Sequence, residues 1–245
     1  MLTFGKNGSQ KLAERVQTDR PYDQSGNADS WEMIDMAIAL LEVSFLDAVL
    51  ITAWDYEVTL LEALAATSAL IAVYLGTTGK RIMWPWWVVS SALYAIWFYQ
   101  YEYYASVATQ FIFIGFGIWG WFGWGPNGAD PSSIPWRYRA IGLGTFALAW
   151  IAFTPYLQSI GAVYIWSDTL GLLGSAFAQF AMVKEKWENW AIWFVVDIVL
   201  TVQYWLGGSY FTSIIYLIFT GIALLGLARW YRRAADATDH SPAAI

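Results

Sequence analysis

Two stretches of this sequence decide its fold, KRIMWPWWVV at residues 80–89 and KWENWAIWFV at residues 186–195. Each stretch has a lysine followed by W-x-x-W at the same spacing. When the chain is shifted by 106 residues, residues 80–124 align with residues 186–230 without a gap, and ten of the 45 positions are identical. Such a match indicates an internal duplication. The identical pairs are Lys80/Lys186, Trp84/Trp190, Trp87/Trp193, Val89/Val195, Tyr104/Tyr210, Ile112/Ile218, Phe113/Phe219, Gly115/Gly221, Gly120/Gly226 and Trp124/Trp230.

The composition around these stretches is that of a membrane protein. The chain has 245 residues, of which 58% are hydrophobic and 13% charged, and its mean hydropathy is +0.43. One soluble core of this size cannot bury that much apolar surface, so a lipid bilayer is the expected solvent.

Seven continuous apolar stretches have the length of about 18 to 20 residues that crosses a bilayer as a helix. None shows the alternation that a barrel strand needs. The predicted spans are 58–76, 84–101, 104–124, 138–156, 163–183, 189–206 and 209–230.

The repeat sets how these spans are arranged. The same shift brings 58–76 close to 163–183 and pairs Glu62 with Asp168. Three spans, one linking span and three more give the two triplets the same orientation in the membrane. We therefore expect an all-α integral membrane protein with a seven-span core, in which two parallel three-helix bundles are joined by a linking helix (3+1+3).

The expected domain organisation follows from these spans. An N-terminal polar segment with an extra helix occupies 1–57, and the first three-helix bundle occupies 58–124. A loop and the linking helix occupy 125–160, the second bundle occupies 161–231, and a polar tail occupies 232–245. The extra helix falls at 34–54, which is long enough to span but contains Glu42 and Asp47; each acid disfavours insertion.

The distribution of Lys and Arg predicts the orientation. If the seven spans alternate, all basic residues between and after them fall on one side of the membrane, and the opposite loops contain none. The positive-inside rule makes that side, with the C-terminus, cytoplasmic. The basic residues are Lys80, Arg81, Arg137, Arg139, Lys184, Lys186, Arg229, Arg232 and Arg233.

Other classes of membrane protein are less well supported. The chain has no Cys, and its one histidine, His240, lies in the polar tail, so neither thiol chemistry nor a His/Cys metal site is expected. A heptahelical sensor with a Schiff-base chromophore lacks a lysine inside a span. A membrane enzyme using Asp168 and Asp197 as a carboxylate pair has no evident nucleophile. We expect no enzyme activity, no cofactor and no metal.

The sixth span carries the most specific group of candidate site residues. Asn189, Trp193 and Asp197 are four residues apart and lie along one helical face, with Trp190 beside the first two. A carboxylate in a membrane helix is a functional candidate, with a hydrogen-bonded packing role as the alternative. The Trp193 ring offers a face against which a cationic aromatic ring can stack.

Polar residues in other spans extend this group. Asp168, Ser175 and Gln179 form a polar stripe on the fifth span, and Gln110 lies within the third. For Gln110, a functional role and an interhelical hydrogen bond are equally open.

Glycine and tryptophan at other positions are expected to have structural roles. Close helix packing is the expected role of glycines such as Gly120 and Gly174. Trp84, Trp86 and Trp136 stand at the starts of spans and are expected to be interfacial anchors.

Several of these motifs together resemble the PnuC family of vitamin transporters. They are Y-A-S-x-x-x-Q at 104–110, G-W-x-x-W at 120–124 and E-N-W-x-x-W-x-x-x-D at 188–197. The resemblance covers about 62–230. Where some nicotinamide riboside carriers of that family have Asn, this chain has Asp197.

The resemblance implies a SWEET-like homotrimer in the bacterial inner membrane that imports nicotinamide riboside by facilitated diffusion. A cytosolic kinase then traps the vitamin by phosphorylation. Thiamine and riboflavin remain open, because related PnuC-like proteins carry them. The implied substrate-binding residues are Gln110, Asp168, Gln179, Asn189, Trp190, Trp193 and Asp197, with the vitamin ring against Trp193.

Overall fold

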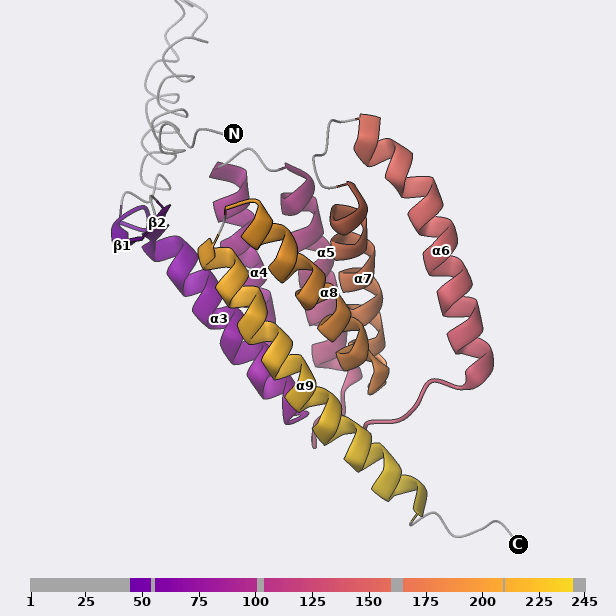
Figure 1. The fold of residues 1–245 in the computed structure, drawn as a ribbon. Helices are drawn as coiled ribbons and strands as arrows, with labels where there is room; N and C mark the ends of the chain where they lie inside the picture. The colour runs from indigo at the N-terminus through magenta and orange to yellow at the C-terminus, as the bar shows by residue number, and fades with distance from the viewer. Residues whose placement is uncertain (1–44, 54–55, 101–103, 160–164, 209, 240–245) are drawn as a thin grey trace, which may run out of the picture.

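The computed structural model describes residues 45–53, 56–100, 104–159, 165–208 and 210–239, and seven helices follow one another through this part of the chain. Figure 1 shows successive helices running in alternating directions, as predicted. The helices match the predicted ranges to within three residues at each end, except that the last continues beyond residue 230. They are α3 (Leu60–Thr77), α4 (Met83–Gln100), α5 (Tyr104–Gly123), α6 (Trp136–Ser159), α7 (Ile165–Val183), α8 (Glu188–Leu206) and α9 (Tyr210–Asp239).

Five of these helices are long and apolar enough to cross a membrane by length and composition alone: α3, α5, α6, α8 and α9. Helix α4, which is rich in Trp and Tyr, and helix α7, which carries the polar stripe, are not among these five. Both pack against apolar neighbours in the same bundle. The chain is therefore an all-α membrane protein, with one short hairpin among the described residues.

The helices pack in chain order and then close into a ring. Helix α4 lies between α3 and α5, and α8 lies between α7 and α9. Two further contacts, α3 with α9 and α5 with α7, join the two sets of three. We call α3–α5 the first triplet and α7–α9 the second triplet. In the sequence repeat, α3 corresponds to α7 and α5 corresponds to α9. The contact of α3 with α9 is therefore equivalent to the contact of α7 with α5, and the packing follows the sequence repeat.

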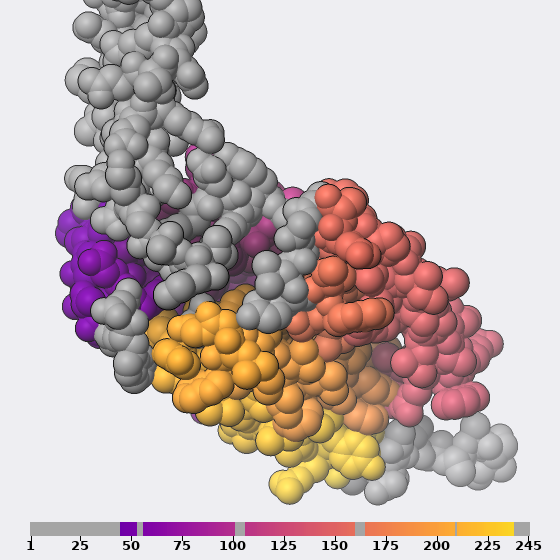
Figure 2. Space-filling view, turned by 45° about the horizontal axis from the view of Figure 1, so that its top comes forward, coloured from indigo at the N-terminus to yellow at the C-terminus, as the bar shows by residue number. Residues whose placement is uncertain are grey.

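Helix α6 lies outside this ring. It packs against α7, and Leu157 is the one buried residue of this helix. In the space-filling view it forms a ridge along one side of the bundle (Figure 2). Its apolar surface is therefore available to lipid or to another chain.

The helix predicted at 34–54 is wrong where the structure describes it. Val49–Ala53 forms strand β1, which pairs antiparallel with β2 (Tyr56–Thr59); residues 34–44 lie outside the described residues. β-Branched residues such as Val49, Ile51 and Thr52 favour strands over helices. The first helix consequently begins at Leu60 rather than at 58, with the Thr59 side chain accepting a hydrogen bond from the Glu62 backbone as its N-cap.

All the Lys and Arg side chains of the described residues gather at one end of the bundle, which we call the basic end. There the loop 124–135 contacts both triplets. The Ala129 amide donates to the Gly79 carbonyl, and Ser132 exchanges backbone hydrogen bonds with Glu185 and Trp187. Arg139 forms an ion pair with Glu188 at 2.6 Å. This loop therefore ties the two triplets together at the basic end.

Candidate functional site

Four tryptophans at the basic end form a layer across both triplets. Trp84, Trp124, Trp190 and Trp230 are 0–2% exposed. Ring centroids are 4.9 Å apart for Trp84 and Trp124, 5.9 Å for Trp190 and Trp230, and 5.8 Å for Trp124 and Trp230. All four belong to the repeated positions, so the duplication built this layer from two copies of one Trp pair. Trp84 is therefore not the interfacial anchor that was expected, whereas Trp86 and Trp136 are exposed.

One glycine in each triplet makes room for this layer. A Cβ atom on Gly120 would overlap the Trp84 ring, and one on Gly226 would overlap the Trp190 ring. The two glycines are equivalent in the repeat. The tryptophan of the middle helix thus packs directly on the backbone of the third helix in both triplets.

One turn further from the basic end, the second tryptophan of each W-x-x-W meets its counterpart. Trp87 on α4 and Trp193 on α8 have ring centroids 5.9 Å apart at an angle of 50°. The Trp193 indole nitrogen is buried and has no hydrogen-bond partner among the described residues. Indole N–H groups in buried positions usually have one. The two aromatic faces come from different triplets, so any movement between triplets alters this pair.

Gln179 on α7 is fully buried, and neither atom of its amide group has a hydrogen-bond partner among the described residues. Asn189 on α8 is also fully buried. Its amide nitrogen donates to the Lys186 carbonyl at 2.5 Å, whereas its side-chain oxygen has no partner. Each unsatisfied buried group costs about 1–3 kcal/mol. Such groups are rare unless they serve a bound molecule or water.

Asp197 lies at the middle of α8 and is 4% exposed. The described residues supply no hydrogen bond to its carboxylate, although its backbone carbonyl accepts one from Thr201. Tyr216 of α9 lies close enough to Asp197 for electrostatic interaction. The Tyr204 and Tyr216 rings stack with centroids 5.2 Å apart. Asp197 is thus a buried acid beside aromatic hydroxyl groups.

The other predicted residues occupy different positions. The Asp168 carboxylate, near the start of α7 and far from the basic end, accepts a hydrogen bond from Gln203 at 2.7 Å. Gln110 is partly buried on α5. Trp190 belongs to the tryptophan layer and is completely enclosed there. The candidate site therefore centres on Gln179, Asn189, Trp193 and Asp197, with Asp168 outside this group.

Sequence analysis missed two components of this site. One is Trp87, which the repeat pairs with Trp193 and which could have been proposed from that equivalence. The other is Tyr216, which interacts with Asp197 and with the two further tyrosines Tyr94 and Tyr204. The position of Tyr216 could have been proposed from the sequence, because the shift of 106 residues aligns it with Gln110, a predicted site residue.

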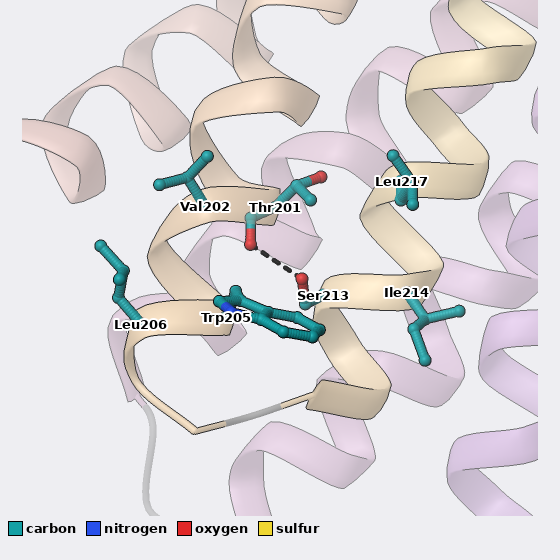
Figure 3. A pocket seen from close by; sticks show the side chains of 7 residues that line it. All are labelled: Thr201, Val202, Trp205, Leu206, Ser213, Ile214 and Leu217. Carbon is teal, nitrogen blue, oxygen red and sulfur yellow. Dashed lines mark hydrogen bonds between the residues drawn. The ribbon is translucent and has the colours of Figure 1, made fainter.

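A shallow groove on the outside of the second triplet is a poor alternative site. It has a volume of about 190 Å³ and lies between α8 and α9 (Figure 3). The Ser213 hydroxyl in it already donates to the Thr201 carbonyl at 2.8 Å. Because its lining is otherwise apolar and largely exposed, this groove is suited to a lipid chain. The lining residues are Thr201, Val202, Trp205, Leu206, Ser213, Ile214 and Leu217.

Comparisons with known proteins agree with this architecture. The model of a family described as "Nicotinamide mononucleotide transporter" matches residues 59–232. The chain is 26% identical over 218 residues to the nicotinamide riboside transporter PnuC of Escherichia coli (strain K12), covering 76% of this chain and 91% of the relative. It is 23% identical over 176 residues to the riboflavin/roseoflavin transporter RibM of Streptomyces davaonensis, covering 67% of this chain and 81% of the relative.

A solved structure shares the fold. The crystal structure of the vitamin B3 transporter PnuC superimposes with a TM-score of 0.62 at 17% identity, covering 89% of this chain and 95% of the other. The family match includes all seven described helices up to residue 232 of α9, and both W-x-x-W segments. The chain therefore belongs to the nicotinamide mononucleotide transporter family of PnuC-type membrane proteins.

Proposed function

We propose that this protein is a PnuC-type transporter that carries nicotinamide riboside across the membrane by facilitated diffusion. The observation that carries the proposal is the contact of Trp87 and Trp193 between the triplets, with buried amides left unsatisfied nearby. Aromatic faces stack on a flat cationic ring. Amide oxygen and nitrogen atoms suit ribose hydroxyl groups. A ring joined to a ribose requires both kinds of contact.

The charges inside the bundle favour the riboside over the mononucleotide in the family's description. A phosphate needs Arg or Lys, or several backbone N–H groups, once it leaves water. Among the described residues, every Lys and Arg lies at the basic end, and the charged residues elsewhere are all acids. A phosphate at the centre of this bundle would meet Asp197 instead of a cation.

In the proposed mechanism the two triplets are the moving units. The ring of the vitamin lies against Trp193 and Trp87, and its ribose is held by Gln179 and Asn189, with Gln110 on the approach from the other end. The tryptophan layer closes the path at the basic end. Rocking of one triplet against the other opens the two ends in turn.

The cellular setting is part of the same proposal. Nine basic residues at one end make that end cytoplasmic in a bacterial inner membrane. The C-terminus is then cytoplasmic. Phosphorylation of the imported riboside by a cytosolic kinase would keep the gradient inward. The exposed apolar face of α6 leaves surface for assembly into a homotrimer.

Binding by the purified protein in detergent tests the proposal. We expect nicotinamide riboside to bind more tightly than nicotinamide mononucleotide, thiamine or riboflavin, as measured by titration calorimetry. Uptake of radiolabelled riboside into proteoliposomes without an ion gradient then tests facilitated diffusion. If riboflavin binds most tightly, as the similarity to RibM permits, the protein is a transporter of a different vitamin. Binding of none of the four would refute the proposal.

A further inference from the structure

The Asp197 carboxylate has no hydrogen-bond donor and no cation beside it among the described residues. The side chain is 4% exposed and lies one helical turn beyond Trp193, on the same face of α8. Among the described residues no side chain and no backbone amide donates a hydrogen bond to it. By contrast, the other buried acid, Glu62, accepts a hydrogen bond from the Tyr56 hydroxyl at 2.7 Å. Asp197 is therefore the less satisfied of the two.

Every Lys and Arg of the described residues lies at the basic end, away from Asp197 at the middle of α8, and three of the arginines have short hydrogen bonds there. Arg81 donates to the Trp121 carbonyl, Arg229 to the Thr77 hydroxyl and Arg139 to Glu188, each at 2.6 Å. Tyr216 of α9 lies close enough to Asp197 for electrostatic interaction. Among the described residues, this buried carboxylate therefore has a tyrosine beside it and no counter-ion.

A buried carboxylate without a counter-ion has two ways to become stable. It can bind a proton and act as a neutral acid, or it can accept a cation that enters with a ligand. A ligand whose positive charge is fixed in an aromatic ring would suit the second way. The same ring would stack on Trp193, one turn away.

We propose that Asp197 makes this site selective for a ring with a permanent positive charge over a neutral ring of the same size and substitution. This inference rests on the proposed function, since it specifies the ligand class of the same site. The acids Glu57, Glu62 and Asp168, on the side of the bundle away from the basic end, would favour the approach of the same cationic ligands.

Two forms of one nucleoside separate charge from shape. Nicotinamide riboside carries a pyridinium cation, and its reduced dihydropyridine form is neutral with the same ribose and carboxamide. Both are titrated by calorimetry into the full-length protein, into Asp197→Asn and into Asp130→Asn. Asn has nearly the shape of Asp, so the first variant removes the charge with little change in packing. Asp130 lies in the exposed loop at the basic end, so the second variant removes the same charge from outside the site.

We expect the original protein to bind the cationic form at least tenfold more tightly than the neutral form. Asp197→Asn should lose roughly ten- to a hundredfold in affinity for the cation and stay within about threefold for the neutral form. Asp130→Asn should behave as the original protein does.

Three results would overturn the inference. Unchanged affinities in Asp197→Asn would show a neutral acid at this position. Equal losses for both forms would show a contact to the ribose or the carboxamide. Equal binding of both forms by the original protein would show a site indifferent to charge. In each of these cases the protein still binds the nucleoside and the proposed function stands, whereas no binding of either form by the original protein refutes both.

Discussion

The two triplets share the tryptophans and glycines that pack at the basic end but have different polar residues. Trp84 packs on Gly120 as Trp190 packs on Gly226, and the four rings form one layer. At the positions of Gln179, Asn189 and Asp197 in the second triplet, the first triplet has Val73, Met83 and Ser91. The shared residues are those that fill space between helices. The unshared residues are buried amide and carboxyl side chains of the second triplet, which indicates that packing was kept after duplication and that the polar groups of the candidate site belong to one copy.

The largest effect should come from breaking the shared packing. Gly120→Ala and Gly226→Ala each place a methyl group inside a tryptophan ring, so we expect each to lower the free energy of unfolding by about 1–3 kcal/mol or more. Thermal unfolding in detergent measures this.

A second pair of repeated glycines provides the control for that experiment. A Cβ atom on Gly115 or Gly221 meets nothing within 4 Å. Gly115→Ala and Gly221→Ala should be neutral or slightly stabilising, because alanine favours a helix. Equal losses in all four variants would show that the Trp–Gly contacts are not the cause.

The next effect tests whether the site uses both triplets. Trp87→Ala and Trp193→Ala should each weaken binding of nicotinamide riboside by about 1–2 kcal/mol, roughly five- to thirtyfold in Kd. Calorimetry measures both, and Trp86→Ala, at a more exposed neighbouring position, is the matched control. A loss confined to Trp193→Ala would assign the aromatic face to the second triplet alone.

A smaller effect should reveal the cost of an unshared polar group. Gln179→Leu replaces an unsatisfied buried amide with an apolar side chain of similar size, as the first triplet has at Val73. We expect stability to rise by about 1 kcal/mol and affinity for the riboside to fall by a similar amount, roughly fivefold. The thermal midpoint and Kd of one preparation test both. A fall in both quantities would instead show that the amide is bonded within the protein.

The smallest effect concerns the loop that ties the triplets at the basic end. Glu188, which pairs with Arg139, stands where the first triplet has the exposed Ile82. Arg139 is 40% exposed, so Glu188→Gln should lower the free energy of unfolding by less than about 1 kcal/mol. High salt should produce much of the same change in the original protein. A larger loss, insensitive to salt, would show that this ion pair holds the basic end closed.

A structural feature could be predicted from the sequence where it depends on residues close together in the chain or on their spacing. The seven helices followed from apolar stretches, and the repeat followed from spacing. Strand β1 (Val49–Ala53) was missed because its apolar residues continue the apolar stretch at 34–48, and together the two have the length of a membrane span. Trp84 was misplaced for a related reason: a tryptophan at a helix start is the same signal in an interfacial belt and in a buried layer.

The sequence by itself determined the solvent, the duplication, the family and the side on which the basic residues lie, because each depends on composition or spacing along the chain. Only the tertiary structure decided that Trp87 meets Trp193 and that Trp124 meets Trp230. Those contacts join residues 106 positions apart and exist because α3 packs on α9 and α5 on α7, which closes the ring. The same closure buries Gln179 and Asp197 away from the cations at the basic end. Hydropathy along the chain cannot show which buried side chains lack partners, because that depends on which helices pack together.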